Sequence, residues 1–131
     1  MTAKQIQKMA KSKLFKKVWG SEEWLVNNDN YCGKILTLNP GFQCSYHYHK
    51  KKDETFYVLE GLVYLKLEGE EIILHPSDSQ RILPGQRHQF ASLDGISKLI
   101  EISTHHEEDD SYRESESDKI NLDELRKRLG L

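Results

Sequence analysis

The sequence predicts an all-β fold, a small antiparallel barrel or sandwich with a short helix at each end. Between residues 17 and 104, short runs rich in β-forming residues recur at regular spacing, and Gly or Pro turns separate them. In the clearest run, Val63, Leu65 and Leu67 alternate with Tyr64 and other neighbours at the period of a half-buried strand. No internal repeat and no alternation of strands with helices is visible, so we do not expect a parallel α/β sheet.

The N-terminal segment, residues 1–16, is basic. Lysine recurs along it without any acidic residue, and Ala3, Ile6 and Ala10 stand at helical spacing. We therefore expect a short amphipathic helix with a solvated basic face, which extends from the barrel predicted for residues 17–104.

The expected strands follow one another through the barrel segment, and several end at turn signals such as Asn39-Pro40-Gly41 or Pro84-Gly85. Residues 63–67 and 72–74 flank Glu68-Gly69-Glu70 and should pair as a hairpin. The remaining stretches of β-forming residues are 35–38, 55–59, 82–83, 88–90 and 98–103.

Beyond the barrel, residues 105–120 are acidic and rich in serine, which predicts an exposed loop. Residues 121–131 predict a C-terminal helix, because Asn121 followed by Glu124 resembles an N-cap with a glutamate at the third helical position. We expect the helix to pack on the barrel or on a second subunit through its apolar face, Leu122, Leu125 and Leu129.

Composition excludes several classes of protein. A chain of 131 residues fits a single domain, and its net charge of −2 argues against a nucleic-acid-binding protein. Apolar runs are too short to span a membrane, and the basic N-terminus lacks the apolar stretch of a secretory signal. Two cysteines, Cys32 and Cys44, are too few for a disulfide framework. We expect a soluble cytoplasmic protein.

Four residues have the types and spacing of a metal site. His47 and His49 are two apart, so on a strand they project from the same face, and Glu54 follows after a short turn. His88 arrives on a later strand. Three imidazoles and one carboxylate suit a divalent ion such as Mn, Fe, Zn, Ni or Co. We expect the other histidines to face loops or solvent: His75, His105 and His106.

The joint pattern resembles the first signature of the cupin family at every defined position. Gly41, His47, His49, Glu54 and Gly61 stand at the spacing of that signature. The resemblance implies the cupin jelly-roll barrel, a double-stranded β-helix, and it implies a metal held by the three histidines and the glutamate.

The second cupin signature is recognisable but altered. Residues 84–88, Pro-Gly-Gln-Arg-His, carry its histidine. Ser77 stands where the family usually has glycine, Leu83 where it has proline, and Ser92 where it often has asparagine. These departures concern turns rather than ligands.

A narrower likeness extends over most of the chain between its two ends. Residues 17–22, 38–41, 58–61 and 98–102 are similar to the cupin domain of type II mannose-6-phosphate isomerases. Residues 101–106 also resemble cupin-type D-lyxose isomerases. The resemblance implies a homodimeric aldose–ketose isomerase that acts on a mannose- or lyxose-like sugar or sugar phosphate.

Isomerisation needs a metal that chelates the carbonyl and its neighbouring hydroxyl, which stabilises an enediolate, and it needs a general base. Glu101 is the candidate base, because the strand register that buries Leu99 also turns Glu101 inward; a salt-bridged surface position is the alternative. Lys52 is the candidate partner of a substrate oxygen, although it also fits a solvated turn. Arg81 and Arg87 flank the second signature and are weaker candidates for a phosphate.

Two other functions fit the same four ligands. Three histidines and a glutamate also suit a metal-dependent dioxygenase that activates O2 at Fe(II). A non-catalytic carbohydrate-binding cupin would use the same pocket without turnover.

Overall fold

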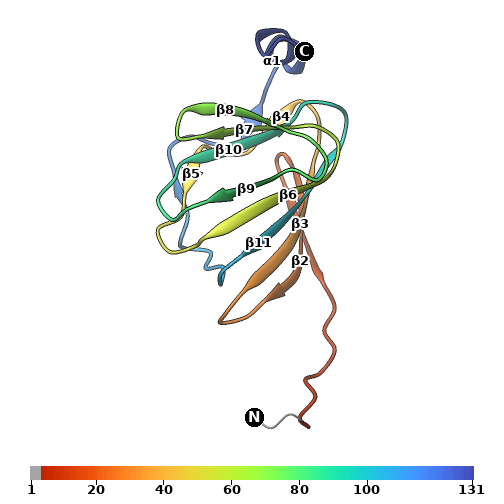
Figure 1. Ribbon diagram of the computed structural model, residues 1–131, viewed down its shortest axis with the longest axis vertical. Helices are drawn as coiled ribbons and strands as arrows, with labels where there is room; N and C mark the ends of the chain where they lie inside the picture. Colours follow the sequence, from red (N-terminus) through yellow and green to blue (C-terminus); the bar gives the residue numbers. More distant parts are fainter. Residues whose placement is uncertain (1–3) are drawn as a thin grey trace.

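The computed structural model describes residues 4–131, which are built mostly of short β-strands (Figure 1). One helix, α1 (Leu122–Arg128), occurs in the described residues. In chain order the strands are β1 (Lys13–Lys17), β2 (Gly20–Asn27), β3 (Cys32–Leu38), β4 (Phe42–Gln43), β5 (His47–Tyr48), β6 (Glu54–Glu60), β7 (Val63–Leu67), β8 (Glu70–Leu74), β9 (Ser79–Ile82), β10 (His88–Ser92), β11 (Ser97–Ser103), β12 (Tyr112–Arg113) and β13 (Asp118–Lys119).

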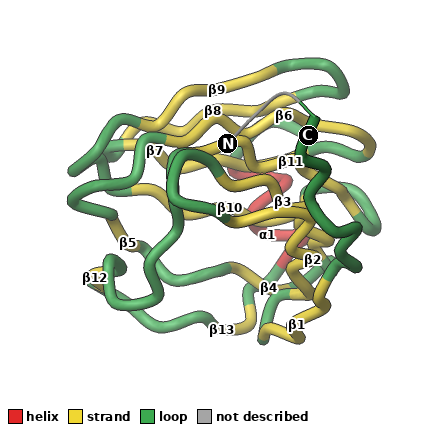
Figure 2. Tube along the Cα trace, turned by 90° about the horizontal axis from the view of Figure 1, so that it is seen from below, coloured by secondary structure: helices red, strands yellow, loops and turns green. Residues whose placement is uncertain are grey.

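The strands form two sheets in which neighbouring strands are antiparallel. One sheet has the order β1-β2-β3-β11-β6-β9, and in the other β10 lies at the centre, with β7 and then β8 on one side and β4 and β5 on the other. The two sheets curve around a common interior (Figure 2). The all-β prediction is therefore confirmed.

Alternation along the strands fills this interior. On β3, β6 and β11 buried and half-buried positions alternate, as the two-residue period of a strand requires. Side chains from both sheets meet in a single core, which consists of Trp19, Leu36, Leu38, Cys44, Phe56, Val58, Val63, Leu65, Leu74, Ile82, Phe90 and Leu99.

The predicted C-terminal helix is confirmed, and it lies at the opposite end of the long axis from the N-terminal segment (Figure 1). Asn121 is its N-cap and accepts a hydrogen bond from the Glu124 backbone N–H. Its apolar residues pack outside the main core, against a second cluster formed by Tyr64, Ala91 and Leu93.

The helix predicted for residues 1–16 is wrong in the part that the structure describes, residues 4–16. Residues 5–12 form no regular element, and Lys13–Lys17 is strand β1, paired with β2. Phe15 instead packs on Trp24, with ring centroids 4.7 Å apart. An apolar face of two alanines and one isoleucine buries too little area to hold a short helix whose lysines repel one another. Met1–Ala3 lie outside the described residues.

The acidic segment, residues 105–120, is mostly irregular, as predicted, but it does not stand free of the barrel. Strand β12 pairs with β5 and strand β13 pairs with β4, so the segment extends the sheet that carries two of the candidate ligands. The described residues contain no helix long and apolar enough to cross a membrane.

Candidate metal centre

Three histidines converge at one end of the interior. His47 on β5 and His88 on β10 are direct partners in the antiparallel register, and His49 follows β5. Each ring offers a nitrogen, and these nitrogens lie within 4.8 Å of one another. The centroids of the His47 and His88 rings are 4.4 Å apart.

Backbone carbonyl groups orient all three rings. The Nδ1 atom of His47 lies 2.8 Å from the Ser45 carbonyl oxygen, that of His49 lies 2.5 Å from Asp110 O, and that of His88 lies 3.0 Å from Gln86 O. Because a carbonyl oxygen only accepts hydrogen bonds, each Nδ1 carries the proton. Each Nε2 is then left with a free lone pair, the form in which imidazole binds a metal.

Glu54, the first residue of β6, lies beside two of the three histidines. Its Oε1 lies 3.0 Å from His88 Nε2 and 3.9 Å from His49 Nε2. Within residues 4–131, neither carboxylate oxygen nor His88 Nε2 makes a hydrogen bond of acceptable geometry, although all three atoms are fully buried. Lys52 forms an ion pair with Oε2, but buried polar atoms without a hydrogen bond are costly, and a metal ion would satisfy Oε1 and His88 Nε2 together. The residues present therefore fit a divalent metal ion.

The electrostatics favour the same protonation states. Burial, helped by the charge of His88, lowers the pKa of His47 to about 3, and burial with the charge of Lys52 lowers that of His49 to about 4. Burial opposes the ionisation of Glu54, but Lys52 and His88 outweigh it and hold its pKa below the usual range. Neutral imidazoles at His47 and His49 and an ionised carboxylate at Glu54 are the states in which these groups ligate metals.

Lys52 and Glu101 lie beside this group rather than at the surface. The Lys52 ammonium is 3.0 Å from Glu54 Oε2 and 3.1 Å from Glu101 Oε2, and both residues are almost fully buried. Burial and the charge of Glu54 raise the pKa of Glu101. The solvated turn considered for Lys52 and the surface position considered for Glu101 are both wrong.

His106 also lines this pocket, so its predicted place in solvent is wrong. Its Nδ1 lies 3.1 Å from Lys52 Nζ, its Nε2 lies 3.3 Å from Glu108 Oε1, and its ring packs edge-on against Trp24. Burial and the charge of Lys52 lower its pKa to about 4. No periodicity in the acidic segment indicated this return to the barrel. His75 is exposed, as predicted, and His105 is half-buried, its Nδ1 2.8 Å from the Asn28 carbonyl oxygen.

Asp110 ties the acidic segment to the turn that carries the ligands. Its carboxylate accepts hydrogen bonds from the backbone N–H groups of Lys50, Lys51 and Lys52, while its own carbonyl faces His49 Nδ1. Sequence reasoning missed this residue, because an aspartate within an acidic run looks like solvated surface.

The opposite wall of the pocket is also charged. Glu22 on β2 accepts hydrogen bonds at Oε1 from Trp24 Nε1 at 2.9 Å and from Lys34 Nζ at 3.3 Å. Lys34 on β3 is 2% exposed. Sequence reasoning missed both residues, although a signal existed, because Lys34 shares the strand parity of the buried residues Leu36 and Leu38.

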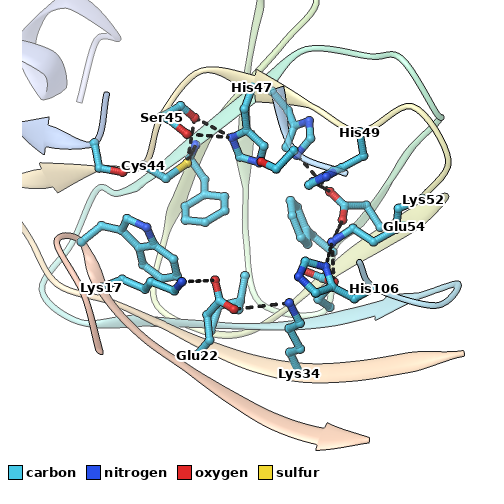
Figure 3. Close-up of a pocket in the computed structure, with 18 of the residues that line it drawn as sticks. Lys17, Glu22, Lys34, Cys44, Ser45, His47, His49, Lys52, Glu54 and His106 are labelled. Atoms are coloured by element: carbon cyan, nitrogen blue, oxygen red, sulfur yellow. Dashed lines mark hydrogen bonds and ion pairs between the residues drawn. The ribbon is translucent and has the colours of Figure 1, made fainter. Parts of the chain in front are cut away.

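One cavity of about 240 Å³ is lined by the residues of this site other than Asp110, namely Glu22, Lys34, His47, His49, Lys52, Glu54, His88, Glu101 and His106. In Figure 3, His47 and His49 lie on one side of it, Lys52 and His106 on an adjoining side, and Glu22 and Lys34 across from the first two. Arg81 and Arg87 do not line it; they pair with Asp53 and with Glu114.

Comparison with known families agrees with this architecture. Residues 34–102, just over half of the chain, match the Cupin domain family. The chain belongs to the cupin family. The resemblance found in the two signatures is thereby confirmed, and this cupin has the expected jelly-roll barrel.

Curated relatives include sugar isomerases. The D-lyxose/D-mannose isomerase of Thermosediminibacter oceani is 32% identical over 64% of this chain and 61% of its own length. The D-lyxose ketol-isomerase of Cohnella laeviribosi is 33% identical over 50% of each chain. The cupin therefore spans less than two thirds of the length of either relative.

A solved structure gives a similar comparison. The cupin-superfamily sugar phosphate isomerase of Silicibacter pomeroyi superimposes with a TM-score of 0.59 and 25% identity, over 66% of this chain and 59% of that one.

Proposed function

We propose that this cupin is a metal-dependent aldose–ketose isomerase for a mannose- or lyxose-like sugar. One observation carries the proposal: a buried carboxylate and ammonium, Glu101 and Lys52, lie 3.1 Å apart beside three histidines whose Nε2 atoms converge. Such a pair supplies a base and a cation to a substrate bound at the histidines. The isomerase names of both curated relatives support the reaction class.

His47, His49, His88 and Glu54 would hold the divalent ion. When bound, the ion polarises the sugar carbonyl and acidifies the proton on C2. The backbone carbonyls behind the three Nδ1 atoms keep the rings aimed at the site before the ion arrives, which limits the ordering that binding requires.

Glu101 is the proposed base. It removes the proton from C2 of the aldose and returns it to C1, while the hydroxyl proton passes from O2 to O1, and the aldose becomes a ketose through an enediolate. A pKa raised by burial suits this role, because the ideal base has a pKa near the working pH. Ser103 Oγ donates to Glu101 Oε2 at 3.3 Å and orients the carboxylate.

Lys52 is the proposed partner of the developing negative charge. Burial lowers its pKa, but Glu101 and Glu54 outweigh that effect and raise it, so the ammonium stays protonated. A fixed ammonium stabilises the oxygen of an enediolate without reorganisation of solvent. It also offsets the repulsion between the two neighbouring carboxylates, Glu54 and Glu101.

The test is an isomerisation assay. Protein loaded with Mn(II) is mixed with D-lyxose, D-mannose and mannose 6-phosphate in turn, in D2O, and followed by proton NMR. Ketose formation, or deuterium entering at C1 or C2, is expected with at least one aldose. Stoichiometric metal without turnover or exchange on any aldose would refute the proposal.

The same samples separate the two alternatives. Consumption of O2 by the Fe(II)-loaded protein would indicate a dioxygenase. Saturable sugar binding without turnover in any metal form would indicate a carbohydrate-binding protein.

A further inference from the structure

We propose that Glu22 and Lys34 form a second subsite, which binds uncharged hydroxyl groups of the sugar at the end remote from the metal. The inference rests on the proposed function for the orientation of the sugar. The binding of the hydroxyl groups is independent of the proposed function, and the experiment below measures this binding without turnover.

Two of the histidines and the second subsite lie in different sheets, whereas Glu54, on β6, belongs to the same six-stranded sheet as the second subsite. His47 and His88 lie on β5 and β10, whereas Glu22 and Lys34 lie on β2 and β3 of the six-stranded sheet. Figure 3 shows Glu22 and Lys34 across the cavity from His47. A polyol bound by one end at the histidines therefore extends toward Glu22 and Lys34.

Both side chains have hydrogen-bonding capacity left. Glu22 Oε1 is occupied by Trp24 and Lys34, but Oε2 makes no hydrogen bond within residues 4–131, and Lys17 Nζ lies 3.9 Å from it. The Lys34 ammonium has three N–H donors. One points to Glu22, and the ammonium also sits 4.4 Å from the centroid of the Trp24 ring. An acceptor and a donor side by side match the vicinal hydroxyls of a sugar.

Stability does not explain this pair. Lys34 is 2% exposed, and burial of a lysine is costly even when it is paired. An apolar residue at position 34 would continue the core formed by Leu36 and Leu38. A charged pair kept at a pocket wall is instead typical of the few polar groups that orient a ligand in its pocket.

The charges favour hydroxyl over phosphate. Each of the two buried lysines is already matched by carboxylates, Lys34 by Glu22, and Lys52 by Glu54 and Glu101. Lys17 also lies within 3.9 Å of Glu22, and its side chain stays partly solvated at 36% exposure. A phosphate placed on Lys34 would meet the Glu22 carboxylate, whereas a hydroxyl can donate to Glu22 and accept from Lys34. The subsite therefore selects an unphosphorylated sugar tail.

The test uses D-mannitol, a reduced sugar that cannot isomerise, titrated calorimetrically into the Mn(II)-loaded full chain. Glu22→Gln, Lys34→Met and the double variant remove the charged groups. The double variant replaces a buried ion pair with uncharged side chains of similar length, a change that proteins often tolerate. Glu23→Gln is the matched control, because Glu23 is on the same strand, on the other face, and accepts from Ser12 Oγ.

We expect Glu22→Gln and the double variant to raise the dissociation constant for D-mannitol about tenfold, the usual loss of a hydrogen bond to a charged group. Glu23→Gln should change it less than about twofold. All variants should keep the metal content of the wild type by elemental analysis.

Wild-type affinity for D-mannitol in Glu22→Gln and in the double variant would overturn the proposal. A wild-type protein that does not bind D-mannitol would overturn it as well. D-Mannitol 1-phosphate binding more than tenfold tighter than D-mannitol, with that advantage lost in Lys34→Met, would also overturn it. If Glu22→Gln fails to fold by circular dichroism, the double variant and the phosphate comparison decide. If the protein isomerises no aldose, but Glu22→Gln and the double variant weaken D-mannitol binding, only the proposed isomerase activity is refuted.

Discussion

Single backbone carbonyl groups control the orientation of the three histidines that we propose as metal ligands. Ser45, Gln86 and Asp110 each place a carbonyl oxygen against the Nδ1 atom of one histidine. Glu54 has no such partner, and its two buried oxygens depend on the neighbouring cation and imidazoles. The histidines are therefore preorganised, while the carboxylate gains most from a bound ion.

Removal of one ligand should release the metal without unfolding the barrel. We expect His88→Ala or Glu54→Ala to weaken Mn(II) binding by at least about tenfold, because each removes a ligand atom from the site. Metal content after dialysis, measured by elemental analysis, checks this. His75→Ala, at an exposed histidine, is the control. Full occupancy in both ligand variants would show that the ligand assignment is wrong.

For single residues, the sequence predicted the features that residue type and spacing determine. His47, His49, Glu54 and His88 stand in recognisable motifs, and strand parity turned Glu101 inward. The contributions of His106 and Asp110 depend on a segment that returns to the barrel from far along the chain, and no local pattern reports such a contact.

Among the elements, the turn between β8 and β9 contains a strained backbone conformation. Ser77 has a φ of 69°, in the left-handed region that favours glycine, and it occupies a position where the cupin signature usually has glycine. The backbone there is fixed by a hydrogen bond from Ser77 N to Val58 O at 2.9 Å. The turn therefore holds a residue other than glycine in a left-handed conformation.

Ser77→Gly should therefore stabilise the protein. Relief of the left-handed strain outweighs the extra backbone entropy of glycine in the unfolded chain, so we expect a gain of about 0.5–1 kcal/mol in the free energy of unfolding. Denaturant titration measures it. Ser77→Ala retains the strain and serves as the control, and equal stability of the two variants would contradict the explanation.

The acidic segment is held to the barrel by Asp110. Burial raises the pKa of its carboxyl, but hydrogen bonds from the backbone N–H groups of Lys50, Lys51 and Lys52 outweigh burial and lower it. A carboxyl whose pKa is lower in the folded chain stabilises the fold above its unfolded pKa, about 3.8, and this contribution disappears as the pH falls through the folded value.

Asp110→Asn should cost about 1–3 kcal/mol of unfolding free energy at neutral pH, because the charged acceptor is lost. The difference from the wild type should shrink as the pH falls below about 4. Urea titrations between pH 3 and pH 7 check both parts. A difference that is independent of pH would mean that the charge of Asp110 has no role in holding the segment.

For the elements, periodicity predicted β3, β6, β7, β8, β10, β11 and the C-terminal helix, but it indicated no strand at β1, β2, β12 or β13, and it failed at the N-terminus. The pattern Ala3, Ile6, Ala10 was too thin to build a helix, and Lys13–Lys17 pairs with β2 because Phe15 finds Trp24 there. The contact between Phe15 and Trp24, which favours a strand, outweighed the helical spacing of the N-terminal apolar residues.

For the whole molecule, the outer face of the six-stranded sheet is the candidate interface of the homodimer that the cupin resemblance implies. Val26 and Ile102 flank Gly33 in adjacent strands, and their side chains are 38% and 59% exposed. Exposed apolar side chains that lie together on one sheet face are typical of an interface between two identical subunits.

We predict a particle of twice the chain mass of 15.3 kDa by light scattering. Ile102→Lys should shift it toward the monomer, because two copies would bring like charges together. Lys98→Met, at a half-buried position on the same strand and face, is the control. A monomeric wild-type protein would contradict this prediction.

The central claim is that Glu101 and the histidine site act on one substrate in one pocket. The direct measurement is the rate of deuterium incorporation at C1 and C2 of the aldose in D2O, in Mn(II)-loaded wild-type protein and in Glu101→Gln. We expect equal metal content in both proteins and a rate about 10²–10⁴ times lower in the variant, the usual contribution of a general base. Exchange at the wild-type rate in Glu101→Gln, with full metal occupancy, would contradict it.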